Sequence, residues 1–95
     1  MSAYFIFTRD KTFDQAEMDL YNEQVRATLA GHDVRILAAY GPFEDVEGHP
    51  TEGTVVAEFP TMEAAKAWYD SPAYREVRVH RFKGAIYRAL LVQGI

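Results

Sequence analysis

Cysteine is absent from the 95-residue chain, and its absence excludes a disulfide framework, a thiolate zinc site and a thiol nucleophile. No hydrophobic run approaches the length of a membrane span, and residues 1–4 lack the basic start of a secretory leader. Basic residues are outnumbered, with 10 Lys and Arg against 14 Asp and Glu. This balance argues against binding along nucleic-acid phosphates. We therefore expect a cytoplasmic protein with neither a membrane nor a nucleic acid as partner.

Motifs for metals and phosphates are also missing. His32, His49 and His80 each lack a second histidine at ligand spacing, and no glycine-rich phosphate loop occurs. Ser71 has no catalytic-triad signature, and helix capping explains it. We therefore expect no metal and no cofactor.

Large apolar side chains are abundant. Hydrophobic residues make up 48% of the chain and aromatic residues 14%. A chain of this length forms one domain, here residues 1–95, and buries only about 60–65% of its unfolded surface. This richness in aromatic rings predicts a second apolar surface, which a homo-oligomer would cover.

Residue periodicity predicts the element order βαββαβ. Alternating or β-branched segments predict strands at residues 3–8, 34–40, 54–59 and 86–93. A capping-box pattern from Thr12 to Gln15 predicts a helix over 13–30, which Gly31 ends. Thr61 and Ser71 predict the starts of two further helical segments, the second running to Gly84. Residues 43–53 are acidic and turn-rich, as in a long hairpin connection.

This order predicts an α+β fold of the ferredoxin-like type, a four-stranded antiparallel sheet with its helices on one face. The first and last predicted strands carry apolar residues on both sides. The face without helices would therefore pack on the same face of a second copy, giving a two-fold homodimer.

The stretch from Glu58 to Tyr74, EFPTMEAAKAWYDSPAY, closely resembles the signature of the DUF1330 family, small proteins of the dimeric α+β barrel superfamily. The resemblance covers nearly the whole chain, although Asp33-Val34 stands where relatives often have paired glycines, and Ala39 where they often have arginine. It implies a dimeric α+β barrel without an established activity. Superfamily relatives include cofactor-independent monooxygenases, isomerases and dehydratases.

Three polar residues are candidates for chemistry. His80 can pass a proton near neutral pH, and Glu58 would act as a base if a closed cleft raised its pKa. The guanidinium of Arg81 could hold a carboxylate or an enolate. The alternative is that His80 lies on the surface, Arg81 forms an ion pair and Glu58 faces solvent.

Aromatic residues are candidates for ligand binding. Trp68 and Tyr69 could wall a pocket, and the hydroxyls of Tyr21, Tyr40 and Tyr74 could contact a ligand. Their helical spacing argues first for core packing.

Two functions stay open from the sequence. One is a homodimer that binds a small aromatic or carboxylate-bearing molecule, with proton-transfer, oxygenase or isomerase chemistry. The other is a non-catalytic homodimer that senses a metabolite or serves as an interaction module. An enzyme should bring its polar candidates together in one cavity, whereas a scaffold would leave them on solvent or in ion pairs.

Overall fold

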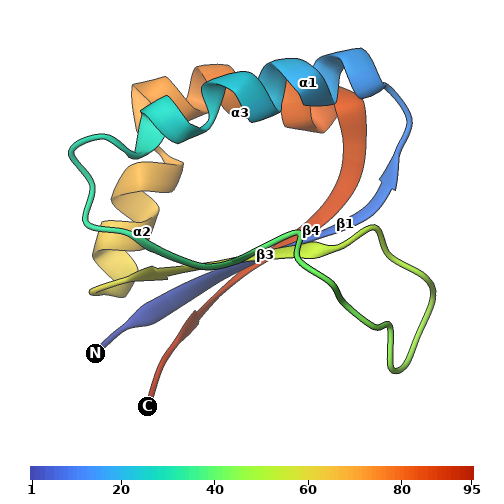
Figure 1. The fold of residues 1–95 in the computed structure, drawn as a ribbon. Helices are drawn as coiled ribbons and strands as arrows, with labels where there is room; N and C mark the ends of the chain where they lie inside the picture. The colour runs from blue at the N-terminus through green and yellow to red at the C-terminus, as the bar shows by residue number, and fades with distance from the viewer.

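The computed structural model describes all 95 residues and has the predicted order of strands and helices. Its strands are β1 (Ala3–Thr12), β2 (Arg35–Ala39), β3 (Thr54–Phe59) and β4 (Ala85–Gln93). Its helices are α1 (Gln15–Gln24), the 3₁₀ turn η1 (Arg26–Leu29), α2 (Met62–Tyr69) and α3 (Pro72–Gly84). The strands pair antiparallel in the order β2-β3-β1-β4, with all helices on one face (Figure 1). This is the ferredoxin-like arrangement that the sequence predicts.

The caps of the two later helices are confirmed. The Thr61 side chain accepts a hydrogen bond from the backbone N–H of Ala64 before α2. The Ser71 side chain accepts one from the N–H of Tyr74, and Pro72 follows at the start of α3. Both side chains satisfy N–H groups that have no partner within the helix.

The prediction for the first helix was wrong at both ends. Thr12 still belongs to β1, where its N–H and hydroxyl donate to the Glu52 carboxylate at 3.0 and 2.6 Å. Asp14 therefore caps α1 instead, accepting from the N–H of Glu17. The helix ends at Gln24, and the chain continues as η1, in which the Thr28 hydroxyl donates to the Val25 carbonyl.

The core lies between the helices and the inner face of the sheet. Phe5, Phe7 and Phe59 are buried on β1 and β3, and all three rings contact the Trp68 ring of α2. Tyr74 of α3 packs on the other side of this group, its ring centroid 4.1 Å from that of Trp68. Trp68 therefore joins both helical segments of the 61–84 region to the sheet.

The middle of the outer face of the sheet is apolar and uncovered by this chain. Ile6 pairs with Val56 on one side and Leu90 on the other, so these three side chains share that face. Leu90 and Val92 of β4 are 56% and 44% exposed. The loop of residues 40–53 projects on the same side, away from the helices (Figure 1). None of the helices has the length and hydrophobicity needed to cross a membrane.

Candidate functional site

A cleft of about 390 Å³ lies between the sheet and the α1–η1 segment. Twelve of its 14 lining residues are hydrophobic, and none is acidic or histidine. The residues that line it are Phe7, Tyr21, Asn22, Val25, Arg26, Leu29, Ile36, Ala39, Tyr40, Val55, Ala57, Phe59, Trp68 and Tyr87. Ala39 and Ala57 on the sheet are small, which leaves space beneath the larger side chains of α1 and η1.

Two pairs of tyrosines lie at the cleft. The hydroxyls of Tyr21 and Tyr74 are 2.8 Å apart and buried, and those of Tyr40 and Tyr87 also bond to each other. Burial raises the pKa of Tyr21, Tyr40 and Tyr74, because the phenolate form would lose its hydration. These hydroxyls therefore keep their protons near neutral pH.

Arg81 of α3 reaches the same region and is only 4% exposed. Its guanidinium carbon lies 5.3 Å from the ring centre of Phe7 and 4.9 Å from that of Tyr87, two residues that line the cleft. It takes part in none of the ion pairs of the chain, and its Nε has no hydrogen-bond partner. We call the four tyrosines and this arginine the tyrosine–arginine cluster.

Trp68 both lines the cleft and packs in the core, the two alternatives that the sequence left open. Its ring lines the cleft and is also part of the core, while its Nε1 donates to the Thr28 hydroxyl at 3.1 Å. Tyr69 lies outside the cleft lining, with the guanidinium carbon of Arg78 4.4 Å from its ring centre. Tyr74 is fully buried and meets the cleft through its bond to Tyr21.

Neither of the two predicted proton-transfer groups lines the cleft. The Nδ1 of His80 is 2.6 Å from a Glu17 carboxylate oxygen on α1. Glu58 lies on the outer face of the sheet, where the Tyr4 hydroxyl donates to it at 3.4 Å and Arg35 is 3.6 Å away. The structure thus separates both residues from Arg81, and their catalytic roles stay predictions.

Tyr40 lines the cleft and has an unusual backbone. Its φ of 54° lies in the left-handed region, which residues with a side chain seldom adopt. Gly53, with a φ of +122°, packs against its ring, and a Cβ there would lie 2.9 Å from Tyr40 Cδ1. The Arg9 guanidinium covers the ring at 4.6 Å. The position of Tyr40 thus depends on the start and end of the 40–53 loop.

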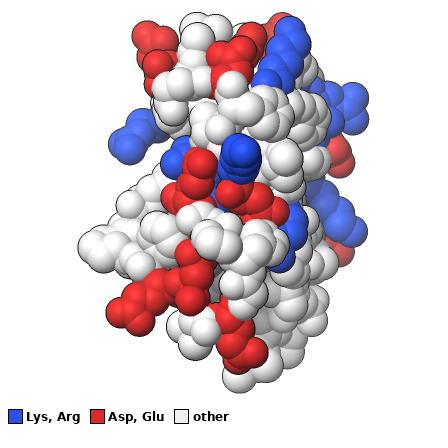
Figure 2. Space-filling model, turned by 90° about the vertical axis from the view of Figure 1, so that its right-hand side faces the viewer, with Lys and Arg blue, Asp and Glu red and all other residues white.

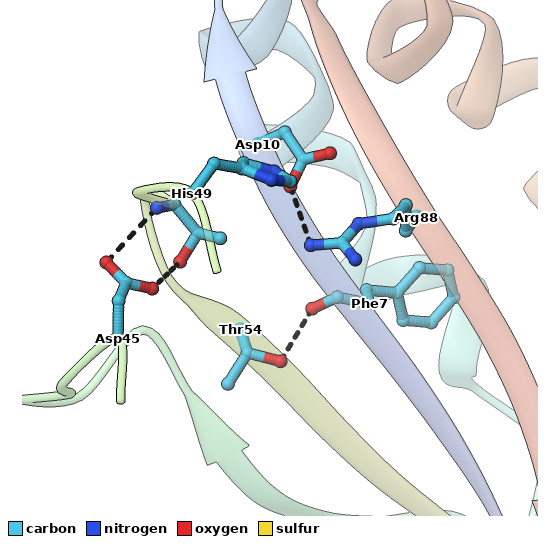
Figure 3. A network of polar contacts seen from close by, with 7 residues as sticks. Phe7, Asp10, Asp45, His49, Thr54 and Arg88 are labelled. Atoms are coloured by element: carbon cyan, nitrogen blue, oxygen red, sulfur yellow. Dashed lines mark hydrogen bonds and ion pairs between the residues drawn. The ribbon is translucent and has the colours of Figure 1, made fainter. Parts of the chain in front are cut away.

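Polar contacts fasten this loop to the sheet (Figure 3). Asp45 accepts from the N–H and hydroxyl of Thr51 within the loop. Asp10 of β1 lies 3.3 Å from His49 and 3.1 Å from Arg88 of β4. Acidic side chains, but no Lys or Arg, are visible on the lowest part of the molecule in Figure 2, on the side toward which the loop projects.

Sequence reasoning missed Tyr87, Arg9 and the contribution of η1. Tyr87 could have been predicted, because residues 85, 87 and 89 share one side of the last strand and Tyr87 is the only large residue among them. Arg9 was missed because the first strand is predicted to end at residue 8, whereas β1 continues to Thr12. No cluster of His, Cys, Asp or Glu suited to a metal ion occurs in the structure.

Several solved structures share this fold. A protein of unknown function from Rhodopseudomonas palustris superposes with a TM-score of 0.76 at 11% identity, over 99% of this chain and 83% of that one. A dimeric ferredoxin-like protein of unknown function from Bacteroides fragilis gives 0.66 at 11% identity, over 98% and 96%. SnoaB, a cofactor-independent oxygenase from Streptomyces nogalater, gives 0.64 at 11% identity, over 99% and 93%.

At these identities the likeness concerns the fold alone. No curated protein matches the sequence. A family model described as a domain of unknown function, DUF1330, matches residues 2–95. The chain therefore belongs to the DUF1330 family.

Proposed function

We propose that the protein binds a small organic molecule with a flat, apolar body in the cleft, and that it does so as a homodimer. The make-up of the cleft carries this proposal: about 390 Å³, with 12 of 14 lining residues hydrophobic. Ligand sites typically have this size and an apolar lining with a few polar groups that orient the ligand. Here those groups would be Asn22, Arg26 and the tyrosine hydroxyls.

The aromatic side chains of the lining favour a planar ligand. Six of the lining residues are aromatic, namely Phe7, Tyr21, Tyr40, Phe59, Trp68 and Tyr87. Aromatic rings stack on flat molecules with little loss of side-chain freedom. An aromatic or conjugated molecule therefore fits this lining better than a sugar or a branched aliphatic one.

Chemical conversion of the ligand by the protein is a second and more specific proposal. Cofactor-independent oxygenase chemistry, as named for SnoaB, is one activity to test at this cleft. The alternative is a non-catalytic homodimer that senses a metabolite. One observation favours the alternative: with no carboxylate or imidazole among the lining residues, the chain supplies no ordinary general base there.

Binding of the neutral fluorophore prodan would test the proposal. Trp68 is the only tryptophan of the chain, so a ligand in the cleft should quench its emission, and calorimetry should give the affinity. Replacing Ala39 by Phe fills part of the cleft and should weaken binding at least about tenfold, which corresponds to about 1.4 kcal/mol. Ala73→Phe, at an exposed position of α3, is the matched control and should bind like the unaltered protein.

Equal affinities for the two variants, or no binding to the unaltered protein, would contradict the proposal. Native mass spectrometry of the purified protein would identify a metabolite bound in the cleft. Incubating the protein with that metabolite then separates the two functions. Conversion of that metabolite in air with uptake of oxygen favours an oxygenase. Recovery of the metabolite unchanged favours the non-catalytic alternative.

A further inference from the structure

The tyrosine–arginine cluster has more hydrogen-bond donors than acceptors. The buried hydroxyls of Tyr21 and Tyr74 form a hydrogen bond with each other, and Arg81, the other polar side chain that reaches Tyr74, can only donate. Each hydroxyl carries one proton, so one of the two protons has no acceptor in the chain. The pair formed by Tyr40 and Tyr87 also has one proton without an acceptor in the chain, but this pair is exposed, so water can accept that proton until a ligand covers it.

Arg81 adds a positive charge to this surplus. Its Nε is buried without a hydrogen-bond partner, and no carboxylate forms an ion pair with its guanidinium. Buried charges in proteins are normally paired, because an uncompensated charge away from water is costly. Contacts with the rings of Phe7, Phe82 and Tyr87 compensate only part of that cost.

The carboxylates of neighbouring elements are held elsewhere. Glu17 of α1 pairs with His80. Asp10 of β1 pairs with His49 and Arg88. Glu52, before β3, binds Thr12 and Arg9. The chain therefore provides the cluster with protons and a cation but with no anion.

The cluster is accessible to a ligand because three of its members, Tyr21, Tyr40 and Tyr87, line the cleft. The charge of Arg81 also reaches the hydroxyls, since it opposes the rise that burial causes in the pKa of Tyr21, Tyr40 and Tyr74. An anion placed in the cleft beside these tyrosines would be close to both the surplus protons and this charge.

Building on the proposed function, we infer that the tyrosine–arginine cluster is an oxyanion site, which binds a negatively charged oxygen of the ligand. That oxygen belongs to a carboxylate or to an ionised phenol or enol. A phenol bound here would ionise more readily than in water, because the donors and the cation stabilise its anion while the neutral form leaves them unsatisfied.

Binding of 4-nitrophenol tests this inference, because its absorbance distinguishes the neutral molecule from the phenolate. Titration of the bound probe with pH should show a pKa at least about one unit below that of the free probe, a tenfold preference for the anion. Arg81→Met should reduce the preference to about threefold or less. Arg75→Met, at an exposed position of the same helix, should retain it.

The double variant Tyr40→Phe/Tyr87→Phe guards against a folding defect in Arg81→Met. It removes both hydroxyls of that pair, and with them its surplus proton, with little change of shape, so it should also lower the preference. A second pair of probes, 4-nitrobenzoate and neutral 4-nitrobenzamide, identifies the source of the oxygen. Tighter binding of the benzoate means that the site takes carboxylates as well, whereas a preference confined to the nitrophenolate means that it takes ionised hydroxyls.

Three results would overturn the inference. Binding of nitrophenol with an unchanged pKa would leave the cleft as a ligand site without an oxyanion site. Binding of prodan but of neither nitrophenol nor nitrobenzoate would lead to the same conclusion. Failure of prodan and of all the nitro probes to bind would remove the proposed function together with the inference.

Discussion

The hydroxyls of Tyr21 and Tyr74 form a buried hydrogen bond, and Arg81 is the other polar side chain that reaches Tyr74. Tyr21→Phe keeps the ring but removes the bond between the two hydroxyls. We expect this substitution to lower the free energy of unfolding by about 1–3 kcal/mol, measured by urea unfolding at pH 7. Tyr4→Phe on the outer face, which loses only a 3.4 Å bond to Glu58, is the control and should change stability much less.

The same pair makes stability sensitive to alkaline pH. Burial raises the pKa of Tyr21 and Tyr74 in the folded protein above the ordinary value of 10.0. Above about pH 10 the unfolded chain therefore loses these protons while the folded chain retains them, so stability falls as pH rises. Each tyrosine contributes at most about 1.4 kcal/mol per pH unit. Tyr21→Phe should show a shallower decline between pH 10 and 11, and an unchanged slope would contradict this account.

Composition and spacing could identify the aromatic residues of the site but not the direction of neighbouring side chains. His80 and Arg81 are adjacent on α3, and neighbours on a helix point about 100° apart. Arg81 turns toward the cleft, while His80 turns toward Glu17. Which of the two faces inward depends on how α3 is rotated against the sheet, and the sequence does not state that rotation.

Among the elements, the 40–53 loop is hydrogen-bonded to β1 and also supports Tyr40 of the cleft. Glu52 lies beside Gly53, which packs on Tyr40, and its carboxylate binds Thr12 of β1. These hydrogen bonds lower the pKa of Glu52, so the stability that they contribute is present near neutral pH and is lost as pH falls through that lowered value.

Glu52→Gln should therefore loosen the loop at neutral pH. The Glu52 side chain is 36% exposed, so we expect a loss of about 1 kcal/mol or less. Hydrogen exchange of amides 40–53 should become faster, and the difference from the unaltered protein should shrink in acid. Glu44→Gln, at an exposed position of the same loop, is the control. Equal exchange in both variants would mean that Glu52 does not anchor the loop.

Short sequence patterns predicted the bounds of an element correctly where no distant interaction involved the same residues. The bounds of β3 and the caps at Thr61 and Ser71 agree with the structure for this reason. The predicted start of α1 disagrees with the structure. Thr12 fits a capping pattern, but its side chain binds Glu52, 40 residues away in sequence, instead of capping the helix. The early end of α1 at Gln24 likewise involves a distant contact, the bond from Trp68 to Thr28. Contacts between residues so far apart cannot be inferred from a short window of sequence.

At the scale of the whole molecule, the outer face of the sheet is the proposed dimer surface. Leu90 is 56% exposed and lies opposite Ile6 near the middle of that face. A carboxylate there would lose its hydration when two sheets pack together, which is strongly unfavourable, and Arg88 on the same face already pairs with Asp10. Leu90→Asp should therefore convert the proposed homodimer into a monomer.

Light scattering after size-exclusion chromatography would measure this change. Leu20→Asp is a matched control, because Leu20 of α1 is 39% exposed but lies on the helical side of the molecule, where the dimer surface does not extend. It should stay dimeric. If the unaltered protein is a monomer at the same concentration, another partner must cover the sheet. If Leu90→Asp remains a dimer, the two copies meet through a different surface, and the outer face stays open to solvent.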